Sequence, residues 1–283
     1  MAKVALVTDS TTYLPQEYLE KYPIQVAPIM IIWSGQELRD GIDIKPEEFY
    51  ARLRTSKESP GTSQPSPQLF KEIFARLLAE GYDILGVFIS SKFSGTFAAA
   101  KQAQAMLPGS KIEIIDSLTG SMGAGWPILS TARAAIGGAS LAECKALVLR
   151  ALEHTGILLM VDTLDYLHRG GRIGGAQRFL GNLLNMKPIL EVVEGSFIGL
   201  ERVRTRHKAL ARLVELLEER IAKRKPVHLA ALHASARETA EKMLQEAVVR
   251  VNPIETLIAD VSPGVGVHLG PGAAGFAFMA GFE

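Results

Sequence analysis

Short apolar runs alternate with longer helical patterns along most of the chain, and this alternation constrains the fold more than any other feature. In the first half the runs end in Asp or Ser: VALVTDS begins at Val4, LGVFISS at Leu85 and IEIIDS at Ile112. Such a rhythm is typical of a layered α/β protein. In a parallel sheet the polar ends of these strands would share the carboxyl edge, where ligands bind. The sequence therefore predicts a mainly parallel sheet with a polar ligand-binding edge.

Hydrophobic periodicity of two residues indicates strands, and periodicity of 3.6 residues indicates helices. Strands are expected at Val4–Thr8, Ile24–Ile32, Ile84–Ile89, Ile112–Ile115, Ile157–Val161, Pro188–Val193, Phe197–Val203, Val227–His233 and Ile254–Asp260. Helices are expected at Pro67–Glu80, Gly95–Met106, Leu141–Glu153, His207–Lys223 and Arg237–Val249.

The sequence pattern changes after Gly156, and a length of 283 residues favours two domains. Glycines crowd Gly170–Gly181, and PILEVVEGSFIGLERV reads as two strands joined by a tight Glu-Gly-Ser turn. We therefore predict an α/β fold with an N-terminal layered domain over residues 1–155. A second α/β domain with an antiparallel hairpin is predicted over residues 156–283.

Composition excludes several classes of protein. The net charge of +1 gives no general attraction to nucleic acid or to an anionic membrane. Cys144 is the single cysteine and lies in an apolar helical stretch, so we expect a buried thiol and no disulfide. Apolar stretches such as Val26–Trp33 are far shorter than the ~20 residues of a membrane span, and the N-terminal run is too short for a signal peptide. A cytoplasmic protein without stable membrane insertion is expected.

Hydroxyl and glycine residues gather in a few short segments that follow expected strands or precede expected helices. These segments are Asp9–Thr11, Gly61–Pro67 (GTSQPSP), Ser90–Phe97 (SSKFSGTF) and Gly266–Gly272 (GVHLGPG). A helix N-terminus with nearby hydroxyl groups can bind a small anion such as a carboxylate or a phosphate. The same residues also serve as helix caps and turn formers, so each segment alone is weak.

Phosphate and metal motifs are not convincing. No P-loop pattern occurs, and GPGAAG at Gly270–Gly275 matches a dinucleotide motif only literally, because too few residues follow it for a βαβ unit. His228 and His233 lie five apart in one expected strand and so point to opposite faces. No metal or cofactor is predicted. His268, which lies among glycines, fits a buried structural role and a functional role equally well.

Ser94, followed by Asp116 or Asp260 and then His268, has the residue order of an α/β-hydrolase triad. The chain lacks the first glycine of the G-x-S-x-G elbow before Ser94, so we expect that hydroxyl to donate a hydrogen bond rather than attack a carbonyl. A Ser94-dependent lipid esterase or hydrolase stays as the alternative function.

Positive charge is concentrated in one segment. Residues Tyr166–Lys225 hold 13 Lys/Arg against 6 Asp/Glu, and no acid lies between Tyr166 and Lys187. The basic residues fall in LHRGGRIGG from Leu167 and RVRTRHK from Arg202. An acid-free stretch of this length favours a surface for an anionic partner. Nucleic acid is not expected, because few aromatic residues are interleaved with the basic ones.

Taken together, these motifs resemble the DegV family of bacterial fatty-acid-binding proteins, which includes FakB, the lipid-carrying component of fatty acid kinase. The resemblance runs nearly end to end and rests on the following motifs: Thr8-Asp9-Ser10, GTSQPS at Gly61, SSKFSGTF at Ser90, Ile115-Asp116-Ser117, LHRGGRIGG at Leu167, KPIL at Lys187, RVRTR at Arg202 and HLGPGA at His268.

The resemblance implies a lipid-binding protein rather than an enzyme, with one long-chain fatty acid, such as hexadecanoate, between two domains. Thr62 of the TSQPS loop would hold the carboxylate together with Ser94 and Gly95 of the Ser-Gly-Thr turn, and His268 would complete their hydrogen-bond network. Ser63 would also belong to this network or to a docking site. The acyl chain would lie in an apolar tunnel.

In the kinase system a family member presents the carboxylate to a separate kinase subunit, which makes the acyl phosphate. Arg169, Arg172 and Arg204 match the arginine-bearing surface of the family and would dock that subunit. The chain departs from the family at Phe93 and Phe97, where leucine and tyrosine are common, and at Leu269, where threonine often follows the histidine. These departures leave the carboxylate donors in place and change the expected shape of the tunnel.

Overall fold

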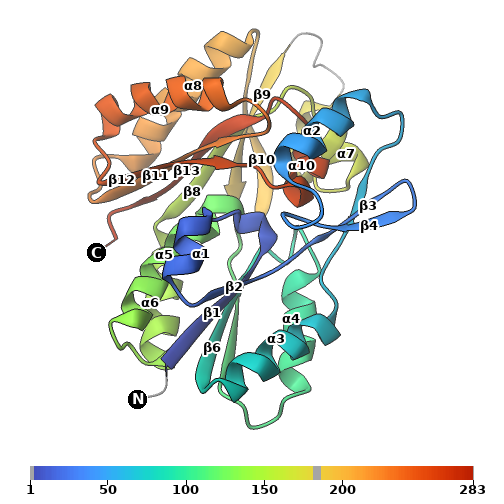
Figure 1. The fold of residues 1–283 in the computed structure, drawn as a ribbon. Coiled ribbons are helices and arrows are strands. Elements are labelled where there is room, and N and C mark those ends of the chain that lie inside the picture. Colours follow the sequence, from blue (N-terminus) through green and yellow to red (C-terminus); the bar gives the residue numbers. More distant parts are fainter. Residues whose placement is uncertain (1–2, 181–185, 283) are drawn as a thin grey trace.

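The computed structural model describes residues 3–180 and 186–282, and its first sheet is parallel, as the strand pattern predicts (Figure 1). Four strands lie in the order β2-β1-β6-β7, all parallel. Their bounds are β1 (Lys3–Asp9), β2 (Ile24–Ala27), β6 (Tyr82–Phe88) and β7 (Ile112–Asp116). Alternate residues of β1 face opposite ways: Ala5 and Val7 pack toward helices α3 (Pro67–Ala79) and α4 (Thr96–Ala105), while Val4 and Leu6 join the central core.

The second sheet has six strands of mixed direction, in the order β10-β9-β8-β13-β11-β12. The strands are β8 (Thr155–Met160), β9 (Lys187–Val193), β10 (Ser196–Val203), β11 (Val227–His233), β12 (Glu255–Asp260) and β13 (Ala274–Ala280). The predicted hairpin is confirmed: Glu194 and Gly195 both have positive φ, 47° and 78°, as a two-residue turn matching the strand twist requires. Helices α8 (Arg206–Ile221) and α9 (Arg237–Val251) cover the outer face of this sheet (Figure 1).

A small third sheet corrects one prediction. The apolar run Ile24–Ile32 is not one strand: it is interrupted at Pro28, and its second part forms β3 (Met30–Trp33) in another sheet. Proline cannot donate to a ladder, which explains the interruption there. The other members of this sheet are β4 (Gln36–Arg39) and β5 (Gly61–Ser63), and α2 (Pro46–Thr55) follows β4 in the chain. Pairing of β5 with β3 fixes the position of the GTSQPS segment.

One helix that the sequence patterns do not predict, α5 (Ser121–Ile136), lies at the centre of the molecule. It contacts β1 of the first sheet and β13 of the second, and Trp126 Nε1 donates to the carbonyl of Ala277 over 3.3 Å. Gly123 lets α5 also lie close to β8, because a Cβ there would lie 2.8 Å from a side-chain carbon of Ile157. One hydrophobic cluster extends through both large sheets, so they share a core.

The chain thus has the predicted α/β architecture, a parallel sheet with helices beside a second sheet that contains antiparallel strands. The remaining elements are η1 (Ser10–Thr12), α1 (Gln16–Lys21), α6 (Leu141–Glu153), α7 (Asp165–Arg169), η2 (Gly174–Phe179) and α10 (Pro263–Leu269). Cys144 on α6 is buried, as expected.

The domain boundary after residue 155 stays a prediction. Across the described ranges, none of the helices combines the length and apolar character needed to cross a membrane.

Candidate functional site

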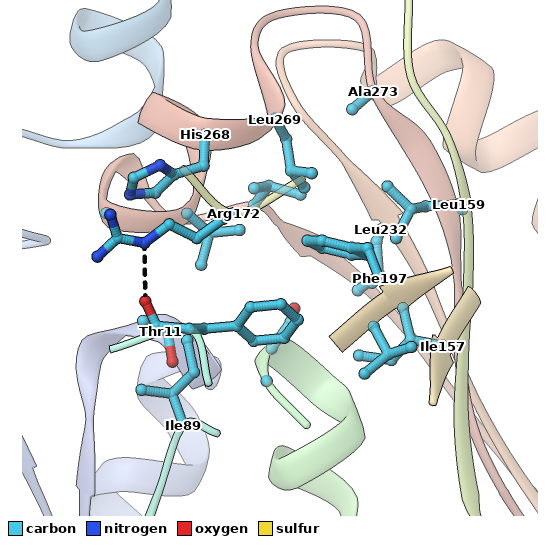
Figure 2. Close-up of a pocket in the computed structure, with 18 of the residues that line it drawn as sticks. Thr11, Ile89, Ile157, Leu159, Arg172, Phe197, Leu232, His268, Leu269 and Ala273 are labelled. Carbon is cyan, nitrogen blue, oxygen red and sulfur yellow. Dashed lines mark hydrogen bonds between the residues drawn. The ribbon is translucent and has the colours of Figure 1, made fainter. Parts of the chain in front are cut away.

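A cavity of about 860 Å³, measured with its open mouth, lies where the carboxyl edge of the parallel sheet meets the second sheet. Most of its lining is apolar and comes from the second sheet, from α10 and from the segments that follow β1 and β6 of the first sheet. Its polar lining residues are Thr11, Thr62, Ser94, Ser121, Arg172 and His268. Figure 2 shows Arg172 and His268 toward one side and Ile157, Leu159 and Ala273 toward the other. The cavity therefore has a polar end and an apolar end.

Thr62 and His268 meet at the polar end, although they are 206 positions apart in the chain. Thr62 Oγ1 lies 3.1 Å from His268 Nε2, and both side chains line the cavity. Thr62 is placed by β5, where it pairs with Ile31 of β3, and His268 lies in the last turn of α10. The opposite ring nitrogen of His268, Nδ1, is buried and has no hydrogen-bond partner among the residues that the structure describes. Burial, and secondarily the nearby charge of Arg172, lower the pKa of His268 to about 4, so the ring is neutral near pH 7.

Ser94 lies in the loop that joins β6 to α4 and lines the same cavity. Its amide donates to the carbonyl of Ser90 over 3.1 Å, and its Oγ lies 2.9 Å from Oγ1 of Thr96. Gly95 does not line the cavity. A Cβ on Gly95 would lie 3.1 Å from Cδ of Gln64, so glycine lets this loop pack closely against the GTSQPS segment. Gly95 thus allows the two polar loops to pack closely and does not contact the cavity.

Arg172 lines the cavity, whereas the sequence led us to expect it on a docking surface. Its Nε donates to the carbonyl of Phe93 over 2.9 Å, the contact drawn in Figure 2, and its Nη1 donates to the carbonyl of Gly170 over 2.6 Å. Of the cavity-lining residues in the described part of the chain, only Arg172 carries a formal charge at neutral pH. The polar end therefore combines neutral hydroxyl and imidazole groups with one cation.

A second, more polar cavity of about 690 Å³, also measured with its open mouth, adjoins the first, and we call it the vestibule. The two cavities share Thr62, Arg172 and His268. Arg169 lines the vestibule, with Nη1 3.2 Å from Oγ of Ser59 and its guanidinium 5.0 Å from the centre of the Tyr166 ring. The polar end of the main cavity thus borders a basic vestibule.

The other two predicted residues lie elsewhere. Ser63 is exposed, and its Oγ donates to the carbonyl of Gln64 over 3.3 Å. As the neighbour of Thr62 in β5 it points to the opposite face of the strand. Arg204 is exposed in the loop between β10 and α8 and lines neither cavity. The three arginines therefore do not form one cluster at the cavity.

Two buried carboxyl groups hold the polar loops in place. Asp9, at the end of β1, accepts from the amide of Ile89 over 2.8 Å and from the hydroxyl of Thr11, which joins the ends of β1 and β6. Burial raises the pKa of Asp9, and these hydrogen bonds oppose the rise.

Asp40 connects the first half of the chain to α10. Its Oδ2 accepts from the hydroxyl of Ser10 over 2.7 Å and from the amide of Gly264 over 3.2 Å. Burial raises the pKa of Asp40 to about 7. Since α10 also carries His268, Asp40 positions that histidine from the far end of the helix. Sequence patterns gave no indication of this role, because the bond to Gly264 spans 224 positions.

The hydrolase triad does not assemble in the described part of the chain. Ser94 hydrogen-bonds to Thr96, whereas His268 hydrogen-bonds to Thr62. Asp116 accepts from the amides of the loops beside it, and Asp260 faces His233, with the carboxylate oxygen 3.4 Å from Nδ1. Within residues 3–180 and 186–282, no group of three or more His, Cys, Asp or Glu side chains is arranged to hold a metal ion.

Comparison with known proteins places this fold and cavity in a family. A family model described as "Uncharacterised protein, DegV family" matches residues 3–281. A DegV domain-containing protein of Caldanaerobacter subterraneus subsp. tengcongensis is 35% identical over 280 residues, covering 98% of this chain and 99% of the relative. The chain belongs to the DegV family.

Solved structures of DegV proteins share the whole fold. A DegV family protein from Thermus thermophilus, described by its fatty acid binding, superposes with a TM-score of 0.93 at 33% identity and covers 98% of this chain and 99% of its own. DegV of Bacillus subtilis, described as a fatty acid binding protein, superposes with a TM-score of 0.91 at 31% identity and covers 99% of this chain and 100% of its own. The resemblance that the motifs indicated is confirmed at the level of family and fold.

Proposed function

We propose that this protein binds one long-chain fatty acid, with the carboxylate at the polar end of the main cavity and the acyl chain at its apolar end. The observation that carries the proposal is the cavity itself, in which Thr62, Ser94, His268 and Arg172 share one end of an otherwise apolar lining. Hydroxyl donors and one cation suit a singly charged carboxylate. The fatty acid binding described for similar DegV structures supports the same ligand.

The two ends of the cavity contribute differently to affinity. Hydrogen bonds to a charged group contribute about 1.5–3 kcal/mol each, whereas burial of an acyl chain contributes about 0.8 kcal/mol per CH₂. For a chain of more than ten carbons, burial of the chain therefore supplies most of the binding free energy. Thr62 and Ser94 then determine which end of the ligand lies near the vestibule.

The proposal includes a carrier role in the cytoplasm rather than catalysis. The bound carboxylate would border the vestibule, through which a separate kinase subunit would reach it to form the acyl phosphate. Arg169, at the vestibule, and the exposed Arg204 are the basic residues available to dock that subunit. In a reconstituted reaction, acyl phosphate should form only when the kinase, ATP and the lipid-loaded protein are all present.

Replacing both Thr62 and Ser94 with alanine tests the carboxylate site. We expect the affinity for a long-chain fatty acid to fall about 150-fold, or roughly 3 kcal/mol, because two donors to the carboxylate are lost. Isothermal titration of delipidated protein measures the change. Ser63→Ala is the matched control, since it removes a neighbouring hydroxyl that points away from the cavity. A wild-type protein with no measurable affinity for fatty acids would refute the proposal, and an equal loss of affinity in S63A would refute the assigned site.

The pKa of His268 gives a pH dependence of stability with a defined sign. The folded value is about 4, below the ordinary value of 6.5, so the neutral ring stabilises the ligand-free protein above pH 6.5. That contribution disappears as the pH falls from 6.5 toward 4, because the unfolded chain then binds a proton that the folded chain does not. We expect the wild type to lose about 2–3 kcal/mol relative to His268→Gln between pH 7 and pH 4.5. Urea unfolding at both values measures this, and parallel losses in the two proteins would contradict it.

A further inference from the structure

Two phenylalanine rings meet at the wall of the main cavity. Phe93 belongs to the loop between β6 and α4, and Phe197 belongs to β10 of the second sheet. Their ring centroids are 4.8 Å apart and their planes are inclined by 37°. In Figure 2, Phe197 lies between the side of the cavity that holds Arg172 and the side that holds Ile157. The aromatic pair is therefore placed where the polar end gives way to the apolar end.

The backbone that carries each ring is held in place. The amide of Phe93 donates to the carbonyl of Ser90 over 2.9 Å, and its carbonyl accepts from Nε of Arg172 over 2.9 Å. Phe197 is 7% exposed, and η2 packs so closely on its backbone that a Cβ on Gly174 would lie 2.7 Å from its carbonyl oxygen. Two rings in direct contact leave no space for an alkyl chain between them, so a ligand must pass along their surface.

We infer that the Phe93–Phe197 pair selects acyl chains that are straight in the part next to the carboxylate. The inference rests on the proposed function and adds a preference among fatty acids. Since Phe93 directly precedes Ser94, its ring meets the chain close to the carboxylate. A saturated chain can lie along a rigid wall by rotating its single bonds. A cis double bond fixes a bend, and in a closely packed cavity that bend overpacks the wall.

Competition between fatty acids of equal length tests the inference. The probes are a saturated acid, an acid with one cis double bond in the half nearer the carboxyl group, and an acid with one cis double bond near the methyl end. We expect the wild type to prefer the saturated acid over the carboxyl-proximal cis acid by roughly tenfold, and over the methyl-end cis acid by about threefold or less. Mass spectrometry of the bound fraction measures these ratios.

Variants of the two rings connect the preference to its cause. In Phe93→Leu and in Phe197→Leu, the discrimination against the carboxyl-proximal cis acid should fall to about threefold or less. Phe97→Leu is the matched control and should keep the wild-type ratio, because Phe97 packs against the hydrophobic cluster of the first sheet, α3 and α4 and does not line the cavity. If one ring variant fails to fold, the other carries the test.

Two results would overturn the inference. One is equal wild-type affinity for the straight and the carboxyl-proximal cis acid, and the other is unchanged discrimination in a folded ring variant. Both leave fatty acid binding intact and so refute only the selectivity. Absence of binding for every fatty acid would refute the proposed function, and the inference would fall with it.

Discussion

Affinity should rise about fourfold for each methylene added to a saturated fatty acid, until the chain fills the apolar end of the cavity. Each buried CH₂ contributes about 0.8 kcal/mol, so six further methylenes would contribute about 5 kcal/mol in total. Titration of delipidated protein with a series of chain lengths measures the slope and the length at which it flattens. Affinity that does not depend on chain length would contradict a buried tail.

The position of the plateau tests where the tail ends. Ala273 is 1% exposed and lines the cavity, and Figure 2 shows it on the side away from His268. Replacing Ala273 with Val, Leu or Phe should shorten the optimal chain progressively, because each larger side chain occupies space that the tail would otherwise fill. Short fatty acids provide the internal control, since their affinity should not change. Equal losses for short and long chains would show that the substitutions disturb the fold rather than the tail.

The fold was predictable where local chemistry determines it. The Glu194-Gly195 turn, the buried strands of the first sheet and the caps of α3 and α6 follow from residue types within a few positions of one another. Helix α5 could not be predicted in this way. Its sequence, SMGAGWPILSTARAAI, contains glycine and proline, which disfavour helices in isolation, and it forms because nearly every face is buried against another element. The strand β13 was also missed. Its sequence, AGFAFMA, is apolar throughout and buried between two neighbouring strands, so it lacks the alternation of polar and apolar residues that marks a half-buried strand.

The sequence predicted the hydrogen-bond donors of the candidate site but not its positive charge. Thr62, Ser94 and His268 stand in polar segments beside strand or helix ends, so the sequence singled them out, and the structure brings all three to one cavity. Arg172 was expected on an outer surface. The sequence of a basic segment does not show which of its arginines points into the protein and which points to solvent. The carbonyls of Phe93 and Gly170 hold it there, and those contacts exist only in the folded chain.

Arg172→Met should lower the affinity for a long-chain fatty acid roughly a hundredfold, or about 2.7 kcal/mol. With His268 neutral, Arg172 is the formal positive charge in the described lining of the cavity, and a buried carboxylate without a counter-charge is strongly disfavoured. Methionine keeps the length and apolar character of the side chain while removing the charge. Arg172→Lys, which keeps the charge and loses the planar geometry, should fall between Arg172→Met and the wild type.

The same substitution also removes the hydrogen bonds to Phe93 and Gly170, so a loss of affinity alone does not identify its cause. A fatty alcohol of equal chain length separates the two effects, because it fills the tail region without a charge. If Arg172 acts through charge, R172M should weaken binding of the acid at least tenfold more than binding of the alcohol. If it acts only by holding the loops, both ligands should weaken equally. In that case the carboxylate would have to be stabilised by the neutral donors Thr62 and Ser94 alone.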